Sequence, residues 1–338
     1  MYYTIYQQRK EGQQEMKEFF TLLKQGNKSA LMAGIVNGII AIIRGIAFAF
    51  TGNVAMFAET MHAIGDTANQ LFVYMGSALS KKAPTERFPS GFGRLVNLVL
   101  LGAVLIVGIM SYETIKEGIH AIIHPKEATG FAVVTSVLAI GVILESSVLF
   151  KAMKEIMHET NTPAKGIQVI SKSFQLVGKA KPATKLVFME DLVATGGGLL
   201  ALAAVIISKF TGFHALEGIA SVIIGIMMFF VVGKVFLDNA AGVIGEADDE
   251  MELKIGRIVM KDPLVKDIRE LVVIKEGEHF HVELQVELAP TLTIAEADNV
   301  RLRVESRVMK VEGVTDITIE FVKDDGVPHW KPEENSTL

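Results

Sequence analysis

Six long apolar segments constrain this chain more than any other feature of its sequence. Each is near or above about 20 residues, the length at which a helix rising ~1.5 Å per residue crosses the ~30 Å hydrocarbon layer of a membrane. A water-soluble domain of 338 residues would rarely be 50% hydrophobic with a mean hydropathy of +0.39, so we expect lipid around these segments. The segments cover residues 30–50, 53–79, 95–114, 129–150, 186–208 and 214–237. The sequence therefore predicts an α-helical membrane protein with six transmembrane helices.

Basic residues gather on one side of these predicted helices, as is typical of segments that stay in the cytoplasm. They are frequent in residues 1–28, in the loop after the second span and in the loop after the fourth span, whereas the opposite side holds only Lys116, Lys126 and Lys209. Because six crossings return the chain to its starting side, we expect both termini to be cytoplasmic. Residues 1–28 lack the apolar core of a cleavable signal peptide, and the expected location is a bacterial inner membrane or an organelle membrane.

The sequence after Asp248 has the composition of a small soluble domain. Residues 279–288 alternate strictly between apolar and polar side chains, which predicts a half-buried strand. The other predicted elements are a helix at 251–260, a strand at 268–275, a helix that follows the capping-box pattern of Thr293 and Glu296, and a strand at 316–322. This order predicts an α+β domain of the ferredoxin-like αββαβ type, with two helices on one face of an open three-stranded sheet.

We therefore expect four parts along the chain. They are a cytoplasmic N-terminal segment (1–28), a six-span transmembrane domain (29–240), a cytoplasmic domain (246–323) and a disordered tail (324–338). From residue 246 onward the chain carries 22 acidic and 12 basic residues, the opposite of the charge that a nucleic-acid partner requires. We expect no nucleic-acid partner.

A polar stripe runs along the second predicted span. At 100° per residue, Glu59, Asp66 and Gln70 fall within about 40° of one another, with His62 and Asn69 on the adjoining flank. Each ionisable group at the middle of a bilayer costs ~2.5 to 3.5 kcal/mol on insertion scales, so the stripe needs compensation. A divalent cation compensates best, because it neutralises two carboxylates at once.

The spacing of His62 and Asp66 suits a metal ion. Residues four apart lie one helical turn above each other, so an imidazole nitrogen and a carboxylate oxygen can converge on one ion at ~2.0 to 2.2 Å. The chain has no cysteine, which leaves His, Asp and Glu as ligands. The other adjacent acidic pair within a span is Glu190 and Asp191 in the fifth span, and glycines at 196–198 would let the two helices approach closely. Adjacent residues point ~100° apart, so one of the pair, not necessarily both, can face the second span.

Three segments together carry a resemblance to a known family. They are residues 56–70 (MFAETMHAIGDTANQ), the loop 89–94 (PSGFGR) and the pair Glu190–Asp191 ahead of a glycine-rich stretch. Over roughly residues 29–323 the chain resembles the cation diffusion facilitator family of metal transporters, in its zinc-transporter-like branch. The resemblance implies a homodimer that holds a divalent ion, usually zinc, between the second and fifth spans and exchanges it for protons. It also implies that residues 246–323 form a metallochaperone-like domain for dimerisation and regulation.

The resemblance also implies a ligand set by position. His62 and Asp66 look like the second-span ligands, and Asp191 looks like the fifth-span aspartate. Many members have His or Asp four residues before that aspartate, whereas this chain has Val187. Glu190 is then the candidate for the missing ligand, as in the branch that shares the E-x-x-H-x-x-x-D-T-x-N-Q pattern.

Two further metal-binding hypotheses concern residues outside this set. Glu59 is either a direct ligand or a residue of the cavity around the ion. His279 and His281 lie on one face of a predicted strand with Glu283, where they could form a cytoplasmic metal site. Exposed polar strand faces also have this composition without any metal.

These observations predict a secondary transporter, not an enzyme. It would export a divalent transition-metal cation, zinc in the first instance, from the cytoplasm in exchange for protons. The expected partners are a second copy of the chain, the metal ion, protons and the lipid bilayer; the metal is cargo and no cofactor is expected.

Four alternatives stay open or are disfavoured by specific features. Iron(II), cobalt or manganese would suit the same imidazole and carboxylate ligands. A membrane sensor that binds metal without moving it, and a proton-coupled exchanger of monovalent cations, are the other transport-related readings. An intramembrane metal enzyme is disfavoured because the chain contains neither a G-x-S-x-G nor an H-E-x-x-H pattern.

Overall fold

The computed structural model describes residues 16–331, apart from residues 128, 165, 181 and 278. The chain divides into two compact units. The first comprises Met1–Gly26, Met75–Val99 and Asp238–Leu338, and the second comprises Asn27–Tyr74 and Leu100–Leu237.

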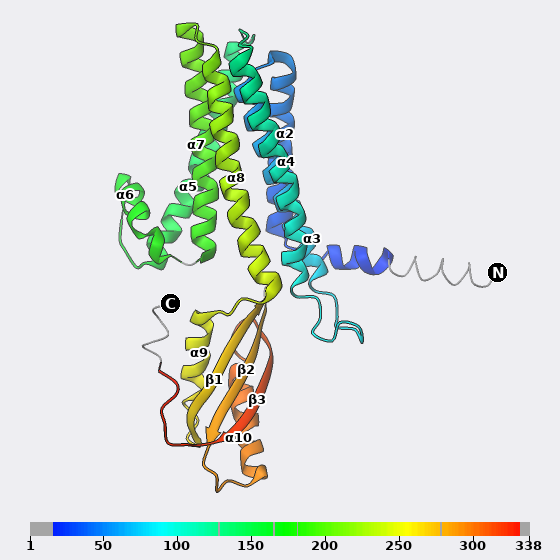
Figure 1. Ribbon diagram of the computed structural model, residues 1–338, viewed down its shortest axis with the longest axis vertical. Helices are drawn as coiled ribbons and strands as arrows, with labels where there is room; N and C mark the ends of the chain where they lie inside the picture. Colours follow the sequence, from blue (N-terminus) through cyan, green and yellow to red (C-terminus); the bar gives the residue numbers. More distant parts are fainter. Residues whose placement is uncertain (1–15, 128, 165, 181, 278, 332–338) are drawn as a thin grey trace, which may run out of the picture. The chain divides into compact units, whose positions relative to one another are not determined.

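Six long helices form where the apolar segments predict them (Figure 1). Five of them, all but α3, are long and apolar enough to cross a membrane by the length and composition of their described residues. Helix α3 is 26 residues long, and the polar stripe lowers its mean hydropathy below that of the others. The helices are α2 (Lys28–Thr51), α3 (Val54–Leu79), α4 (Leu95–Ile123), α5 (Phe131–Glu159), α7 (Pro182–Thr211) and α8 (Ala215–Ile244). The predicted class, a helical membrane domain followed by an α+β domain, is confirmed.

The surfaces of these helices suit lipid rather than water. Large apolar side chains stand exposed on them, among them Ile42, Leu105 and Ile143, each more than half exposed. Such continuous apolar exposure is rare on soluble proteins and normal on a face turned to acyl chains. Small residues let the helices pack closely: the backbones of Gly118 in α4 and Gly218 in α8 meet directly, so that a Cβ on Gly118 would lie 2.9 Å from the Gly218 carbonyl oxygen.

The segment between α5 and α7 contains a helix that the sequence analysis treats as loop. Helix α6 (Ile167–Leu176) and the short 3₁₀ helix η1 (Val177–Lys179) pack beside α5 (Figure 1). Their core is a local cluster that includes Ile156 of α5, Val169 of α6 and Phe188 of α7. The apolar residues of α6 lie on one half of the helix, partly in this core and partly exposed, and its polar residues lie on the other half, so the helix is amphipathic.

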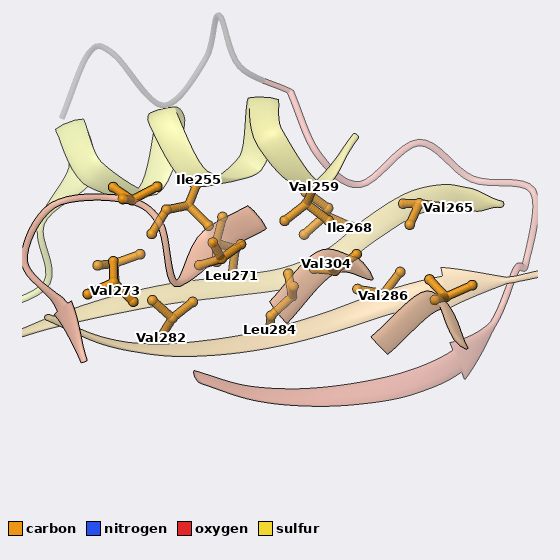
Figure 2. Close-up of a cluster of buried hydrophobic side chains, with 14 of the residues drawn as sticks. Ile255, Val259, Val265, Ile268, Leu271, Val273, Val282, Leu284, Val286 and Val304 are labelled. Carbon is orange, nitrogen blue, oxygen red and sulfur yellow. The ribbon is translucent and has the colours of Figure 1, made fainter. Parts of the chain in front are cut away.

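The C-terminal part of the first unit has the predicted αββαβ order. Strand β2 is central: it pairs antiparallel with β1 and parallel with β3. Both helices contribute to one core with the inward side chains of the strands, and Figure 2 shows Ile255 and Val259 above Leu271 and Leu284. The elements are α9 (Asp249–Val259), β1 (Val265–Glu276), β2 (His279–Leu288), α10 (Ile294–Val308) and β3 (Val314–Lys323). The capping box of Thr293 and Glu296 is present at the start of α10.

Residues 324–331 make defined contacts, which differs from the disordered tail expected for 324–338. The carboxylate of Asp267 in β1 accepts hydrogen bonds from the backbone amides of His329 and Trp330, at 2.5 and 3.4 Å. The Trp330 ring lies against Gly256 of α9, where the missing side chain leaves space for it. An apolar ring and a carboxylate that caps two amides therefore hold this stretch; residues 332–338 lie outside the described part of the chain.

Candidate metal centre

A cavity opens among α3, α4, α7 and α8 in the second unit. It encloses roughly 510 Å³ of space, part of it open to the surroundings. Valine and methionine side chains of α4, α7 and α8 form most of its wall. Its polar lining comes from His62, Asp66 and Asn69 of α3 and from Glu190 of α7. Part of the polar stripe of the second span thus faces a cavity that Glu190 of the fifth span also lines.

His62 and Asp66 lie one helical turn apart, as their spacing predicts. His62 Nε2 is 3.4 Å from Asp66 Oδ2; the His62 side chain is 12% exposed and that of Asp66 is 46% exposed. His62 Nε2 is buried and has no hydrogen-bond partner. A buried polar atom without a partner is costly, and a metal ion accepting its lone pair would remove that cost.

Only one residue of the acidic pair of α7 lines the cavity. Glu190 lines the cavity, whereas Asp191 is not among its lining residues. Asp191 Oδ2 is buried without a hydrogen-bond partner, and Asp191 is close enough to Asp66 and Glu145 for their charges to act on it. His62 Nε2 and Asp191 Oδ2, both buried without hydrogen bonds, therefore lie in the same region as the carboxylates of Asp66 and Glu190. This donor set suits a divalent cation.

Glu59 is engaged elsewhere, by a buried arginine. Arg44 of α2 lies between Glu59 of α3 and Glu145 of α5, with Nη1 3.2 Å from Glu59 Oε2 and Nη2 2.6 Å from Glu145 Oε1. Arg44 Nη1 also donates to the backbone carbonyl of Glu59 at 3.3 Å. Glu59 is 1% exposed and does not line the cavity. The geometry makes Glu59 a counter-ion of Arg44, and we leave it out of the ligand set.

Two glycines make room for this ion triad of Arg44, Glu59 and Glu145. A Cβ on Gly141 of α5 would lie 2.5 Å from Arg44 Nη2, and one on Gly198 of α7 would lie 3.0 Å from Glu145 Oε2. The triad thus depends on α2, α3, α5 and α7 together. The sequence analysis does not find it, because its members come from three helices; single charges in the middle of apolar segments were its only sequence signal.

His279 and His281, which the sequence suggests as a second metal site, have different surroundings. His281 lies between two acids, with Nδ1 3.2 Å from Asp316 Oδ2 and Nε2 3.4 Å from Glu283 Oε1. The two carboxylates approach opposite ring nitrogens, so they do not converge on one point. His279 stands at the start of the same strand and joins no cluster of three potential ligands among the described residues.

Another cluster, which the sequence analysis misses, lies where the tail crosses the sheet. Potential ligand atoms of Glu287, Asp325 and His329 lie within 4.8 Å of one another. Arg269 already pairs with two of them, with Nη1 3.4 Å from Glu287 Oε1 and 3.3 Å from Asp325 Oδ2. Glu287 is fully buried on the otherwise polar strand face because the tail covers it. The cluster therefore acts as an ionic contact that anchors the tail.

Comparison with known proteins adds two family matches. Residues 30–242 match the model of the cation efflux transmembrane domain, and residues 247–321 match that of the cation efflux protein cytoplasmic domain. Together the two matches cover the helices that line the cavity and the αββαβ domain.

Similar proteins include relatives of unequal length. A Xenopus laevis protein named proton-coupled zinc antiporter SLC30A9, mitochondrial, is 25% identical over 261 residues, which is 74% of this chain and 44% of that protein. Its Homo sapiens counterpart is 23% identical over 258 residues, 73% of this chain and 43% of that protein. The uncharacterized transporter MJ0449 of Methanocaldococcus jannaschii is 22% identical over 294 residues, 84% of this chain and 93% of that protein. The chain thus spans less than half the length of the mitochondrial relatives and most of the archaeal one.

Proposed function

Because this chain belongs to the cation efflux family, we propose that it is a secondary transporter that exports a divalent transition-metal cation, zinc in the first instance, from the cytoplasm in exchange for protons. One observation carries the proposal. His62, Asp66 and Glu190 line one cavity between membrane helices, and His62 Nε2 is buried there without a hydrogen-bond partner.

The metal would be cargo, held by a set of side chains on two helices. His62 and Asp66 supply a nitrogen and an oxygen from α3, and Glu190 or Asp191 supplies oxygens from α7. Three or four such ligands suit tetrahedral zinc. Iron(II), cobalt or manganese would accept the same ligands, and zinc is preferred here because relatives carry that metal in their names.

Proton exchange follows from the chemistry of these ligands. Imidazole and carboxylate bind a metal only in their deprotonated forms, so protons and metal compete for the same atoms. Metal that arrives from one side displaces protons, and protons that arrive from the other side displace metal. Rocking of the helices around a fixed site would expose it to each side in turn.

Orientation and assembly belong to the same proposal. The lysines and arginines gathered on one side favour a cytoplasmic position for both termini. The αββαβ domain would join two copies of the chain. This part of the proposal rests on the match of residues 247–321 to a cytoplasmic-domain model whose name refers to a dimer. The alternative hypothesis is a membrane sensor that binds the metal ion at the same site but does not carry it across the membrane. Only a measurement of metal flux distinguishes the sensor from the transporter.

A flux assay tests the proposal. The full chain is reconstituted into liposomes with a zinc dye and a pH dye inside, and zinc is added under an imposed proton gradient. We expect zinc to move against protons, and His62→Ala or Asp66→Asn to abolish both signals. His158→Ala is the matched control, because the His158 side chain is 86% exposed and no described residue of α5 is among those that line the cavity. Zinc accumulation by His62→Ala at the control rate contradicts the site, and metal binding without flux favours the sensor.

A further inference from the structure

Helix α6 is held in place by one of its faces. Val169 and Ser173 are almost fully buried, and Val169 packs with residues of α5 and α7. The ring of Phe174 meets Phe188 of α7 edge-on, with ring centres 5.4 Å apart. The orientation of the remaining faces is therefore fixed relative to α5 and α7.

A second face of α6 is apolar and exposed. Ile167 is 84% exposed, Ile170 43% and Phe174 49%. At 100° per residue these three fall within about 60° of one another. The third face, which carries Gln168, Ser171 and Gln175, is polar and exposed. A helix with a packed face, an apolar face and a polar face is suited to a boundary between oil and water.

Lysines surround this helix. Residues 151–185 contain seven lysines and only two acids, Glu155 and Glu159. Among the described lysines, Lys151, Lys154, Lys179 and Lys185 are exposed. The neighbourhood of the apolar face is thus strongly basic, which is the complement of an anionic surface.

The lengths of α5 and α7 place α6 at the edge of the membrane. Helix α5 has 29 residues, and those that hold α6 lie between Leu149 and Met157. At 1.5 Å per residue these positions are about 27 to 39 Å from Phe131, which brackets the far edge of a ~30 Å hydrocarbon layer. The apolar segment of α7 begins at residue 186, directly after Lys185. Both helices put α6 at the level of the headgroups.

From these four observations we propose that α6 lies on the inner surface of the membrane, with Ile167, Ile170 and Phe174 at the boundary of the acyl chains and the surrounding lysines on anionic phospholipid headgroups. The occupant of this face is lipid, because the exposed apolar surface continues onto the lipid-facing side of α7 at Val187. A second copy of the chain on this face is the alternative outcome of the test.

The absence of cysteine from the chain makes a direct test possible. An Ile170→Cys variant carries a single environment-sensitive fluorophore, and Gln175→Cys carries the same label on the polar face as its matched control. Both full-length proteins are placed in nanodiscs that contain phospholipids with brominated acyl chains. We expect several-fold stronger quenching for the Ile170→Cys label than for the control. Equal quenching overturns the proposal, and disulfide-linked dimers of unlabelled Ile170→Cys show that a second copy covers the face instead.

A second measurement tests the role of charge. Trace fluorescent phosphatidylglycerol or phosphatidylcholine is added as an energy-transfer acceptor to neutral nanodiscs that hold the labelled Ile170→Cys protein. We expect phosphatidylglycerol to be enriched near the label, and Lys179→Gln with Lys185→Gln to reduce that enrichment by up to about five-fold per lysine. Lys126→Gln with Lys209→Gln, on the opposite side of the predicted spans, removes the same two positive charges and is the control. Equal transfer from both lipids overturns the anionic part of the proposal; no metal is used, so failure of metal transport leaves this result unaffected.

Discussion

At the scale of single residues, the membrane unit contains two charge systems of different kinds. In the ion triad, the Arg44 guanidinium supplies the counter-charge of two acids, with Nη1 3.2 Å from Glu59 Oε2 and Nη2 2.6 Å from Glu145 Oε1. In the cavity, no arginine or lysine is among the described lining residues beside His62 and Asp66. The triad therefore contains its own cation, whereas the cavity side chains would gain one from a bound metal ion.

The triad predicts a large cost for removing its cation. Arg44→Gln leaves two carboxylates buried without a counter-charge, and we expect a loss of about 3–5 kcal/mol in the free energy of unfolding. Thermal unfolding of the purified chain in detergent measures this, with Lys116→Gln as an exposed control on α4. A melting temperature equal to that of the control would show that the triad contributes nothing.

The pair on α7 predicts a graded loss of metal affinity. Glu190 lines the cavity and Asp191 Oδ2 is buried without a hydrogen-bond partner, so we expect Glu190→Gln and Asp191→Asn each to weaken zinc binding. Changes outside the ligand shell already cost 10–100-fold in affinity, so loss of a direct ligand should cost at least about tenfold. Calorimetric titration of the two variants ranks them. If one variant binds zinc as tightly as the parent chain, that residue is not a ligand.

The sequence predicts the residues of α3 better than those of the triad. His62 and Asp66 follow from a local spacing on one helix, whose geometry is known in advance. Arg44 and Glu145 are 101 residues apart, and only the packing of three helices brings them together. Which of Glu190 and Asp191 faces the cavity depends on the rotation of α7, which the sequence does not specify.

At the scale of elements, one buried carboxylate joins two segments of the αββαβ domain. Asp262, between α9 and β1, accepts two hydrogen bonds from Arg303 of α10, both of 2.8 Å. A third comes from the backbone amide of Leu264 at 3.2 Å. The paired hydrogen bonds from Arg303 hold the pKa of the Asp262 carboxyl below its ordinary value. This contact fixes α10 against the turn that precedes the sheet.

Replacing that carboxylate predicts a pH-dependent change in stability. We expect Asp262→Asn to lower the free energy of unfolding by about 2 kcal/mol near neutral pH, the typical worth of hydrogen bonds to a charged group. Because the folded-state pKa is lowered, the stabilisation is fully present above the unfolded value of about 3.9 and is lost as the pH falls through the folded-state value. The difference between parent and variant should therefore shrink in acid. Denaturation followed by the emission of the single tryptophan, Trp330, measures both.

The elements also differ in how far the sequence predicts them. Strand β2 has the bounds that strict alternation predicts, and the capping box marks the start of α10. Helix α6 carries an amphipathic period, with its apolar residues on one half of the helix. It is ten residues long and lies in a lysine-rich connection between two apolar segments, so its composition resembles that of a loop.

At the scale of the whole molecule, residues 324–331 are part of the αββαβ domain. Asp267 in β1 accepts the amides of His329 and Trp330, and the Trp330 ring lies on Gly256. The polar and charged composition of residues 324–338 predicts disorder, because composition cannot show that one ring and one carboxylate find partners on a distant strand and helix.

Releasing the tail predicts a change in tryptophan emission. Asp267→Ala removes the acceptor of both amides, and we expect Trp330 to become more exposed to water. Its emission should shift to longer wavelength and become more accessible to iodide quenching. Asp316→Asn, on an exposed part of β3, is the control. Unchanged emission in Asp267→Ala would mean that the ring alone holds the tail.

The direct contact between α4 and α8 has a mechanical consequence. Gly118 meets Gly218, and Gly225 lies against the carbonyl of Ser111, so main chain touches main chain at two levels. Backbone contacts at two levels leave little room for α4 and α8 to slide or tilt against each other. We expect α4 and α8 to move together as one rigid body. Any change in access to the cavity must then come from α3 or α7 moving relative to that rigid pair.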